Sequence, residues 1–407
     1  MTGSHNAALD LKRIEAGLRK TTETLAQELA RPGAYAPDWS PSEWRIARAV
    51  AVLHGVSPLL SRRLRWSGPA GWESFLAEQE RHTRARYLRI RELLRLIDEE
   101  ARTDGVAFLA LKGSALHEIG LYAAGERPMA DVDLFTDADD AERMAAILVR
   151  VRYRATEVSW KHRVFEPAQA GPAAIFGEHC DNAIKIDLHV RIREVLPLCP
   201  VDASRLITPP KPCPGLNPYR SQAALLIHLL LHAAGGMPSR SLRLVQLHDL
   251  ALLSARMSGA DWDEVLGLSG SVGGFWWAFP PLSLVARYYD VIPRRILTAA
   301  ELECRWPLKR SCRQQMLWEV SYSNLQRSVL PGIPWARSVR EALGYVAERT
   351  ALSARMLSMA AVPDRSPAPE TGALCSDPES RALRWVSFLP ARPATLNAVR
   401  RALAQPQ

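Results

Sequence analysis

The stretch from residue 106 to residue 136 constrains the fold of this chain more than any other part. It begins with an apolar run of strand length, 106–111, and continues with Lys112, Gly113 and Ser114. Small residues directly after a strand favour a sharp turn into a helix, and backbone N–H groups at the start of such a helix form a natural phosphate site. The pattern therefore predicts a strand, a tight junction and a helix that begins near Ser114. The plainer interpretation is that Gly113 only makes the turn.

A second strand is predicted over 131–136, where the sequence reads DVDLFT. Alternate side chains of a strand share a face, so Asp131 and Asp133 project together while Val132 and Leu134 point into a core. Two carboxylates held this close repel each other, and a cation between them relieves the repulsion. Because oxygen ligands favour Mg²⁺ or Mn²⁺, we interpret the pair as a candidate metal site. An ordinary exposed strand end is the alternative.

A third strand is predicted over 183–192, which alternates between apolar and polar residues. Such alternation is typical of a half-buried strand whose polar face lies over solvent or over a functional site. Asp187 on the polar face is the best candidate for a third carboxylate, whereas Val190 is expected on the apolar face. His189 shares a face with Asp187 and could orient it, contact a substrate or act as a base. A histidine of the core is an equal alternative.

The order of strand, small-residue turn, helix and Asp-x-Asp strand resembles the signature of the DNA polymerase β-like nucleotidyltransferase superfamily. More narrowly, the chain is similar to a bacterial family of uncharacterised nucleotidyltransferases. The residues that carry this resemblance are Leu-Lys-Gly at 111–113, Tyr122, Arg127 and Asp-Val-Asp-Leu at 131–134. The resemblance covers about 93–255.

The resemblance implies transfer of a nucleoside monophosphate from a nucleoside triphosphate to a hydroxyl or phosphate acceptor, with Mg²⁺ or Mn²⁺ as cofactor. Two divalent ions can clamp the attacking and leaving oxygens, which requires carboxylates from separate segments. The catalytic and metal-binding roles then fall on Asp131, Asp133 and Asp187, and the last of these can help deprotonate the acceptor. The nucleotide-binding roles fall on Lys112, Gly113, Ser114 and Arg127. Substrate contact or support of the site falls on His189 and Asp249.

Some of these residues also have a purely structural interpretation. Lys112 and Arg127 could be surface charges, and Asp249 could be an ion-pair partner within a helix. His228 and His232 are four residues apart and share a helix face, but no carboxylate joins them at a useful spacing in the sequence. We therefore expect packing or polar contacts for this pair rather than a metal site.

The periodicity predicts an α+β fold in which a small mixed β-sheet nucleotidyltransferase core is flanked by helical regions. The expected divisions are an N-terminal helical region, a core, a linker, a C-terminal helical domain and a flexible tail with a short helix. Their boundaries are 1–101, 102–194, 195–220, 221–361 and 362–407. Dense prolines mark the linker and the start of the tail.

The bulk composition narrows the class of partner. The net charge of +9 suits an acidic partner such as a nucleotide, a nucleic acid or an acidic peptide, although arginine-rich composition explains it equally well. The six cysteines show no C-x-x-C pair, which argues against a zinc site and a disulfide framework. No apolar run is long enough to span a membrane and no signal peptide is visible, so a cytoplasmic protein with reduced thiols is expected.

Three functions stay open at this level. The first is transfer to an acceptor that could be a peptide, a protein or a small molecule. The second is a catalytically idle module that binds a nucleotide and regulates a partner. The third is nucleic-acid binding through the basic N-terminal helices, which would be sensitive to salt.

Overall fold

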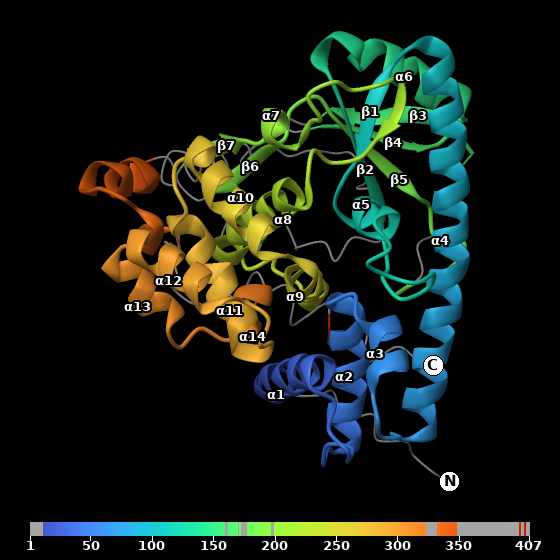
Figure 1. Cartoon of the computed structure of the whole chain (residues 1–407). Coiled ribbons are helices and arrows are strands. Elements are labelled where there is room, and N and C mark those ends of the chain that lie inside the picture. Colours follow the sequence, from blue (N-terminus) through green and yellow to red (C-terminus); the bar gives the residue numbers. More distant parts are fainter. Residues whose placement is uncertain are drawn as a thin grey trace, which may run out of the picture.

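The computed structural model describes residues 11–158, 162–169, 171, 177–196, 199–322, 332–347, 399 and 403. A six-stranded mixed sheet lies beside a large body of helices that come from both ends of the sequence (Figure 1). This arrangement confirms the predicted α+β class with helical regions on either side of a small mixed sheet. The predicted tail, 362–407, lies outside the described residues apart from Val399 and Leu403. Among the described residues, no helix has both the length and the apolar character needed to cross a membrane.

Four helices form the N-terminal region: α1 (Leu11–Ala30), α2 (Pro41–Leu53), α3 (Ser57–Arg63) and α4 (Ala70–Asp104). Helix α2 begins with a capping box in which the side chains of Ser40 and Glu43 each accept the other's backbone N–H. Helix α4 is 35 residues long and ends at Gly105, whose φ of 67° suits a left-handed cap. This long helix runs from the N-terminal helices along the sheet and so joins the two parts (Figure 1).

The main sheet contains β1 (Ala107–Ala110), β2 (Asp131–Thr136), β3 (Tyr153–Val158), β4 (Arg163–Pro167), β5 (Lys185–His189) and β8 (Gly215–Asn217). The strands follow one another across the sheet in the order β3-β4-β5-β2-β1-β8. Strand β2 is antiparallel to β1 and parallel to β5. Helix α5 (Lys112–Glu118) follows β1, and the 3-10 turn η1 (Ala138–Asp140) and helix α6 (Ala141–Arg150) follow β2.

The two faces of the sheet differ because the strands alternate. Val132 of β2 and Ile186 of β5 are buried in a core with α4 and α6, while the polar residues of both strands point to the opposite face. The alternation predicted over 183–192 holds only as far as His189, where β5 ends. Val190, which was expected on the apolar face, is 36% exposed. The chain leaves the sheet there, so the strand is shorter than predicted.

The segment 195–220, which was expected to be a linker, instead contributes to the core. It includes the end of a hairpin of β6 (Arg193–Leu196) and β7 (Cys199–Asp202), then the short helix α7 (Ser204–Ile207), then β8. Strand β8 pairs in parallel with β1, and the Gly215 N–H donates to the Val106 carbonyl at 2.8 Å. The prediction of a simple linker is therefore wrong for this part of the chain.

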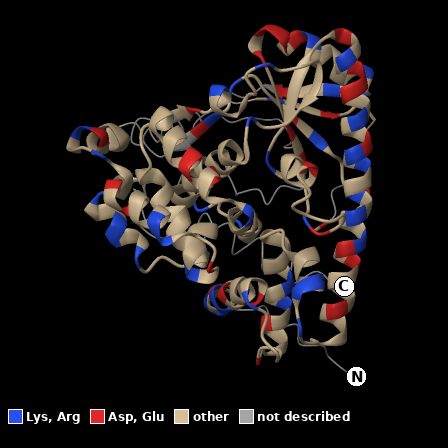
Figure 2. Ribbon diagram, in the orientation of Figure 1, with Lys and Arg blue, Asp and Glu red and all other residues tan. Residues whose placement is uncertain are grey.

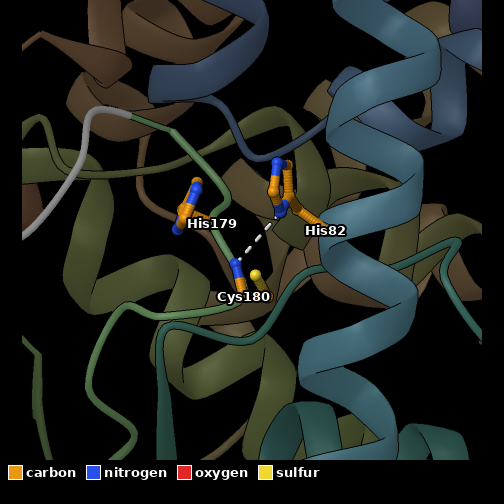
Figure 3. A group of neighbouring side chains, drawn as sticks. All are labelled: His82, His179 and Cys180. Atoms are coloured by element: carbon orange, nitrogen blue, oxygen red, sulfur yellow. Dashed lines mark hydrogen bonds between the residues drawn. The ribbon is translucent and has the colours of Figure 1, made fainter.

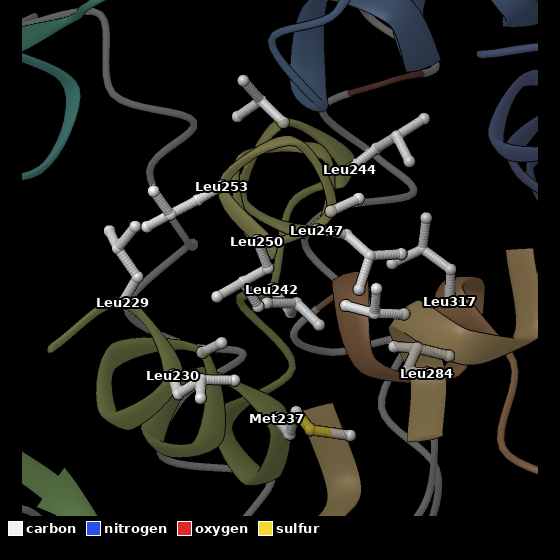
Figure 4. Packing of buried hydrophobic residues seen from close by; sticks show 14 of the residues in the cluster. Leu229, Leu230, Met237, Leu242, Leu244, Leu247, Leu250, Leu253, Leu284 and Leu317 are labelled. Carbon is white, nitrogen blue, oxygen red and sulfur yellow. The ribbon is translucent and has the colours of Figure 1, made fainter. Parts of the chain in front are cut away.

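The C-terminal region is helical, as predicted. Its elements are α8 (Gln222–Ser239), α9 (Leu244–Arg256), α10 (Gly259–Ser269), η2 (Gly270–Val272), η3 (Trp276–Ala278), α11 (Phe279–Tyr288), α12 (Arg294–Glu303), α13 (Trp306–Cys312), α14 (Leu317–Ser321) and η4 (Ile333–Trp335). Leucines of α8 and α9 pack against Leu284 and Leu317 from the later helices (Figure 4). Burial of apolar side chains of this kind is the main stabilising term in folding.

Helices from the two ends of the chain share one core. Ile14 and Leu18 of α1 belong to the same buried cluster as α8 to α14. The Thr22 hydroxyl lies 2.7 Å from the Tyr322 hydroxyl across that contact. Glu23 accepts a hydrogen bond from the Tyr288 hydroxyl at 2.6 Å. The N-terminal helices therefore pack on the C-terminal helices as well as preceding the sheet.

Candidate active site

Three carboxylates meet on the polar face of two neighbouring strands. Asp133 of β2 is paired in register with Asp187 of β5, and Asp131 lies two residues before Asp133 on the same face. Neighbouring strands are about 4.8 Å apart, and paired residues project to the same side. Asp133 is buried, Asp187 is half-buried and Asp131 is exposed. The cluster therefore opens to solvent at the start of β2.

Asp133 is held by two nitrogen atoms. Lys112 Nζ donates to Asp133 Oδ1 at 3.0 Å, and His189 Nε2 lies 3.0 Å from the same oxygen. Burial alone would raise the pKa of Asp133, but the Lys112 ammonium and the hydrogen bond with His189 hold that pKa well below its ordinary value. Burial also opposes the charge of Lys112, yet Asp133 raises the pKa of the ammonium. The carboxylate and the ammonium are thus both charged at neutral pH.

Asp187 has the opposite character. Burial, together with repulsion from Asp131 and Asp133, raises the pKa of Asp187 to about 6. Desolvation by the surrounding protein and the charge of Asp133 also raise the pKa of Asp131, although Asp131 keeps contact with solvent. His162 Nε2 lies 3.4 Å from Asp187 Oδ2. Asp131 and Asp187 thus resist ionisation beside the ionised Asp133. A cation bound among the three carboxylates would relieve the repulsion between them.

The donor atoms of this cluster fit a divalent cation. One ligand atom from each of His162, Asp187 and His189 lies within 4.8 Å of the other two. Carboxylate oxygens suit Mg²⁺ and Mn²⁺, while imidazole nitrogens suit transition metals. The three carboxylates could hold Mg²⁺, and the two histidines add donors that Mg²⁺ does not prefer. Sequence analysis had considered His189 as a substrate or supporting residue and had not joined His162 to it, since the two come from different strand ends.

Gly113 and Ser114, which were predicted to contact phosphate, are buried in this structure. A Cβ added to Gly113 would lie 2.3 Å from Arg127 Nη1 and 3.1 Å from Met129 Cγ. Gly113 is therefore required by close packing and not by its backbone conformation, since its φ lies outside the left-handed region. That unusual conformation belongs to Lys112, with φ of 48°. The Ser114 hydroxyl faces the Met129 sulfur at 3.7 Å.

Arg127 lies in a buried ion pair with Asp249 of α9. Its Nε and Nη2 atoms donate to the two carboxylate oxygens at 2.8 Å and 2.7 Å, and the Tyr122 hydroxyl donates to Asp249 Oδ1 at 2.7 Å. Burial opposes the charge of Arg127, but Asp249 raises the pKa of the guanidinium. This arrangement matches the structural interpretation of Asp249 and leaves Arg127 few donors for a phosphate. The ion pair therefore connects the Gly113 junction to α9 of the C-terminal region.

A second polar cluster joins the Lys112 junction to α8. The Tyr219 hydroxyl lies 3.4 Å from the Lys112 backbone N and 2.8 Å from His228 Nδ1. On the far side of His228, its Nε2 atom lies 3.4 Å from the buried carboxylate of Glu194, which also contacts His232 Nδ1 at 3.2 Å. Burial would raise the pKa of Glu194, but His232 and His228 hold it well below its ordinary value. The expected polar contacts of the histidine pair are present.

Nothing in the sequence pattern indicated the role of Glu194, because this residue belongs to β6 and lies 38 residues before His232. The sequence also argued against a zinc site, yet His82, His179 and Cys180 lie together between α4 and the loop that follows β4 (Figure 3).

Hydrogen bonds assign this cluster a structural role. His82 Nδ1 accepts the Cys180 N–H and His179 Nδ1 accepts the Asp181 N–H, both at 3.2 Å. A neutral ring that accepts at Nδ1 carries its proton on Nε2, which then has no lone pair for a metal. The cluster anchors the loop to α4. The four cysteines described as free, Cys180, Cys213, Cys304 and Cys312, agree with the expectation of unpaired thiols.

The mixed sheet carries three carboxylates on two adjacent strands, and the partly buried Lys112 lies beside them. Carboxylates that converge in this way can hold the divalent ions used by the class of enzymes that act on phosphate groups. Within that class, the model of the uncharacterised nucleotidyltransferase family matches residues 40–279, and the chain belongs to this family. The reaction class is therefore nucleotidyl transfer, with a nucleotide as substrate. The match includes α2 to α4 and extends to α11, beyond the stretch on which the resemblance rested. No curated protein and no solved structure matches the chain.

Proposed function

We propose that this nucleotidyltransferase moves a nucleoside monophosphate from a nucleoside triphosphate to a hydroxyl or phosphate acceptor, in the manner of the DNA polymerase β-like superfamily. The observation that carries the proposal is the register of β2 and β5, which pairs Asp133 with Asp187 and places Asp131 on the same face. The acceptor group belongs to a peptide, a protein or a small molecule. The positive net charge of the chain suits a polyanionic donor.

The residues have distinct roles in this proposal. A divalent ion held by Asp131, Asp133 and Asp187 would neutralise charge on the transferring phosphate and lower the pKa of the acceptor oxygen. Lys112 neutralises Asp133 in the free enzyme, and its ammonium can turn to the β- or γ-phosphate when the nucleotide binds. Asp187, with its pKa raised to about 6, can accept a proton from an acceptor hydroxyl near neutral pH.

The histidines beside Asp187 favour Mn²⁺ over Mg²⁺ as the cofactor. Imidazole binds Mn²⁺ better than it binds Mg²⁺, which requires hard oxygen ligands. We expect His162→Ala to weaken Mn²⁺ binding at least about tenfold and to leave Mg²⁺ binding unchanged. The free Mn²⁺ signal in electron paramagnetic resonance measures this without any enzyme turnover, and His179→Ala is the matched control. Equal Mn²⁺ affinity of the His162 and His179 variants would show that His162 is not a ligand.

A catalytically idle nucleotide-binding module is the second candidate. It is favoured by one observation, the contact of Lys112 and His189 with the same oxygen of Asp133. If this lysine never leaves the carboxylate, the chain binds a nucleotide without transferring it.

Nucleic-acid binding through the N-terminal helices has less support. Helix α4 carries both basic and acidic residues (Figure 2): the arginines of its second half, Arg95 and Arg102, form ion pairs with neighbouring acids, whereas 81–91 contains five arginines and no acidic residue. Arg95, for example, pairs with both Glu92 and Glu99. Within 81–91, Arg86 and Arg89 donate to backbone carbonyls of the loop after β4, which leaves few arginines of this helix for a phosphate backbone.

The proposed function is tested by incubating the protein with each of the four α-³²P-labelled nucleoside triphosphates, Mn²⁺ or Mg²⁺, and a cell lysate as the source of acceptors. Label on the protein or on a lysate component is expected from the wild type and not from Asp131→Asn/Asp133→Asn. The control Asp137→Asn/Asp139→Asn removes the same charge just beyond β2 and should transfer label normally. Binding of nucleotide without transfer would favour the idle module, and absence of nucleotide binding would refute both.

A further inference from the structure

A cavity of about 250 Å³ lies between the end of α3, the loop after α5 and the second half of α9. None of the three carboxylates lines it. Arg62 and Arg256 at its edge are exposed, Arg63 is partly exposed, and Tyr122 and His248 are buried. The cavity therefore runs from a basic rim at the surface to a base made by two buried aromatic side chains.

The rim is positively charged because three arginines face one carboxylate, Glu126. Arg62 forms ion pairs with Glu126 and with a glutamate of α4. Arg256 donates hydrogen bonds to two backbone carbonyls of the loop after α5. Arg63 makes no hydrogen bond or ion pair with any residue that the structure describes. Arg63 and the buried His248 both line the cavity. Among the described residues, the Arg63 guanidinium therefore has no anionic partner.

The base of the cavity contains a polar atom that the protein does not satisfy. His248 Nδ1 lies 3.1 Å from the Tyr289 hydroxyl, whereas the buried Nε2 atom has no hydrogen-bond partner among the described residues. Burial lowers the pKa of His248 to about 3, so the ring is neutral. When the Tyr289 hydroxyl donates to Nδ1, the ring proton lies on Nε2. His248 has no accessible surface, so its neutral ring closes the base of the cavity without contacting an occupant.

The walls between rim and base are apolar and include Leu59, Leu121 and Leu252. A dry cavity of about 150 Å³ in another protein holds one benzene ring, so the larger volume here has room for a ring and an anionic group. We propose that this cavity binds a small organic anion. The ring of this anion packs between the leucines, and its phosphate or carboxylate pairs with Arg63.

This site is connected to the catalytic junction by direct contacts. Tyr122 in the cavity wall donates to Asp249, Asp249 holds Arg127, and Arg127 packs against Gly113. A bound ligand would therefore contact Tyr122, the first residue of the hydrogen-bond network that leads to the Lys112 junction. The inference does not depend on which reaction the carboxylates perform.

The test is isothermal titration of the full chain with three probes: phenyl phosphate, inorganic phosphate and benzyl alcohol. Phenyl phosphate should bind more tightly than either of the others, because it alone has both the ring and the anion. Arg63→Gln should weaken its binding about tenfold, the loss expected for one charge-assisted hydrogen bond. Arg65→Gln, an exposed arginine two residues away that does not line the cavity, should leave binding unchanged.

A second variant tests the location without relying on charge. Ala255→Trp adds a large side chain at an exposed lining position of α9 and should abolish phenyl phosphate binding while the chain stays folded. The inference is overturned if phenyl phosphate does not bind at about 10 mM, or if the Arg63 and Arg65 variants bind it equally. It is also overturned if inorganic phosphate binds as tightly as phenyl phosphate, since the apolar walls would then contribute nothing.

Discussion

The ion pair between Arg127 and Asp249 decides whether Arg127 supports the fold or binds the nucleotide. The side chain of Asp249 is 2% exposed and that of Arg127 is 10% exposed, so removal of either partner leaves a buried charge without compensation. Such a loss costs about 3–5 kcal/mol. Replacing both partners by apolar residues removes both charges and leaves the Tyr122 hydroxyl without its acceptor and the Pro128 carbonyl without the Arg127 Nη1 donor, at about 1–3 kcal/mol.

The perturbation is therefore a double-mutant cycle of Arg127→Met, Asp249→Leu and the double variant. Each single variant should lower the free energy of unfolding by more than the double variant does, with a coupling of at least about 3 kcal/mol. Urea unfolding followed by tryptophan fluorescence measures these free energies. Effects of the two single changes that add to within about 0.5 kcal/mol would refute the reasoning, because uncoupled residues add in that way.

The same variants separate the structural role from nucleotide binding. If Arg127 acts only through Asp249, the double variant should bind nucleoside triphosphate as tightly as the wild type. If Arg127 contacts a phosphate, as the resemblance implied, both Arg127→Met and the double variant should bind about tenfold or more weakly. Equilibrium dialysis with a labelled nucleotide at low temperature keeps the less stable variant folded during the measurement.

Three further predictions follow from the site. Gly113→Ala should lower the free energy of unfolding by about 1–3 kcal/mol because its Cβ meets Arg127, while Gly71→Ala, with no atom within 4 Å, should be neutral or slightly stabilising in the same urea assay. The pKa of Asp187 is raised from 3.8 to about 6, so the metal-free chain should lose stability as pH rises between these values. Mn²⁺ affinity should rise over the same interval. Unfolding free energies from calorimetry that do not change with pH in this interval would contradict the prediction. Glu194 has a lowered pKa, so its contribution to the stability of the fold is present above about pH 4.5 and lost below it. Glu194→Gln should lower the free energy of unfolding by about 1–3 kcal/mol at pH 7. The difference between this variant and the wild type in thermal unfolding should shrink in acid.

The sequence predicted the central part of the sheet well because local patterns determine it. Strand β2 occupies 131–136, the predicted range, and its alternation placed Asp131 and Asp133 on one face. The pairing of Asp133 with Asp187 could be inferred only through the resemblance, because register between strands 54 residues apart is a tertiary property. The structure adds that Asp187 is the carboxylate with the raised pKa.

The features that sequence analysis missed are non-local. Strand β8 is three residues long and forms only because β1 offers a free edge, so neither periodicity nor composition marked it. The resemblance implied that Arg127 contacts phosphate, and the sequence alone could not show its buried partner Asp249, which comes 122 residues later. Gly113 was expected to give a ligand close access, and its neighbour is instead an arginine of the same chain.

The shared core of the two helical regions has a consequence for synthesis. Thr22 meets Tyr322 across 300 residues of sequence, so the part of α1 that packs on α11 and α14 has no partner until the ribosome has made those helices, although α2 covers the rest of its buried face at once. At about 5–20 residues per second, this delay is roughly 15–60 s. During that time this part of the apolar side of α1 is exposed to other nascent chains and to chaperones. The yield of soluble protein should therefore depend on chaperone supply more strongly than for a chain whose first helices pack only on their immediate neighbours.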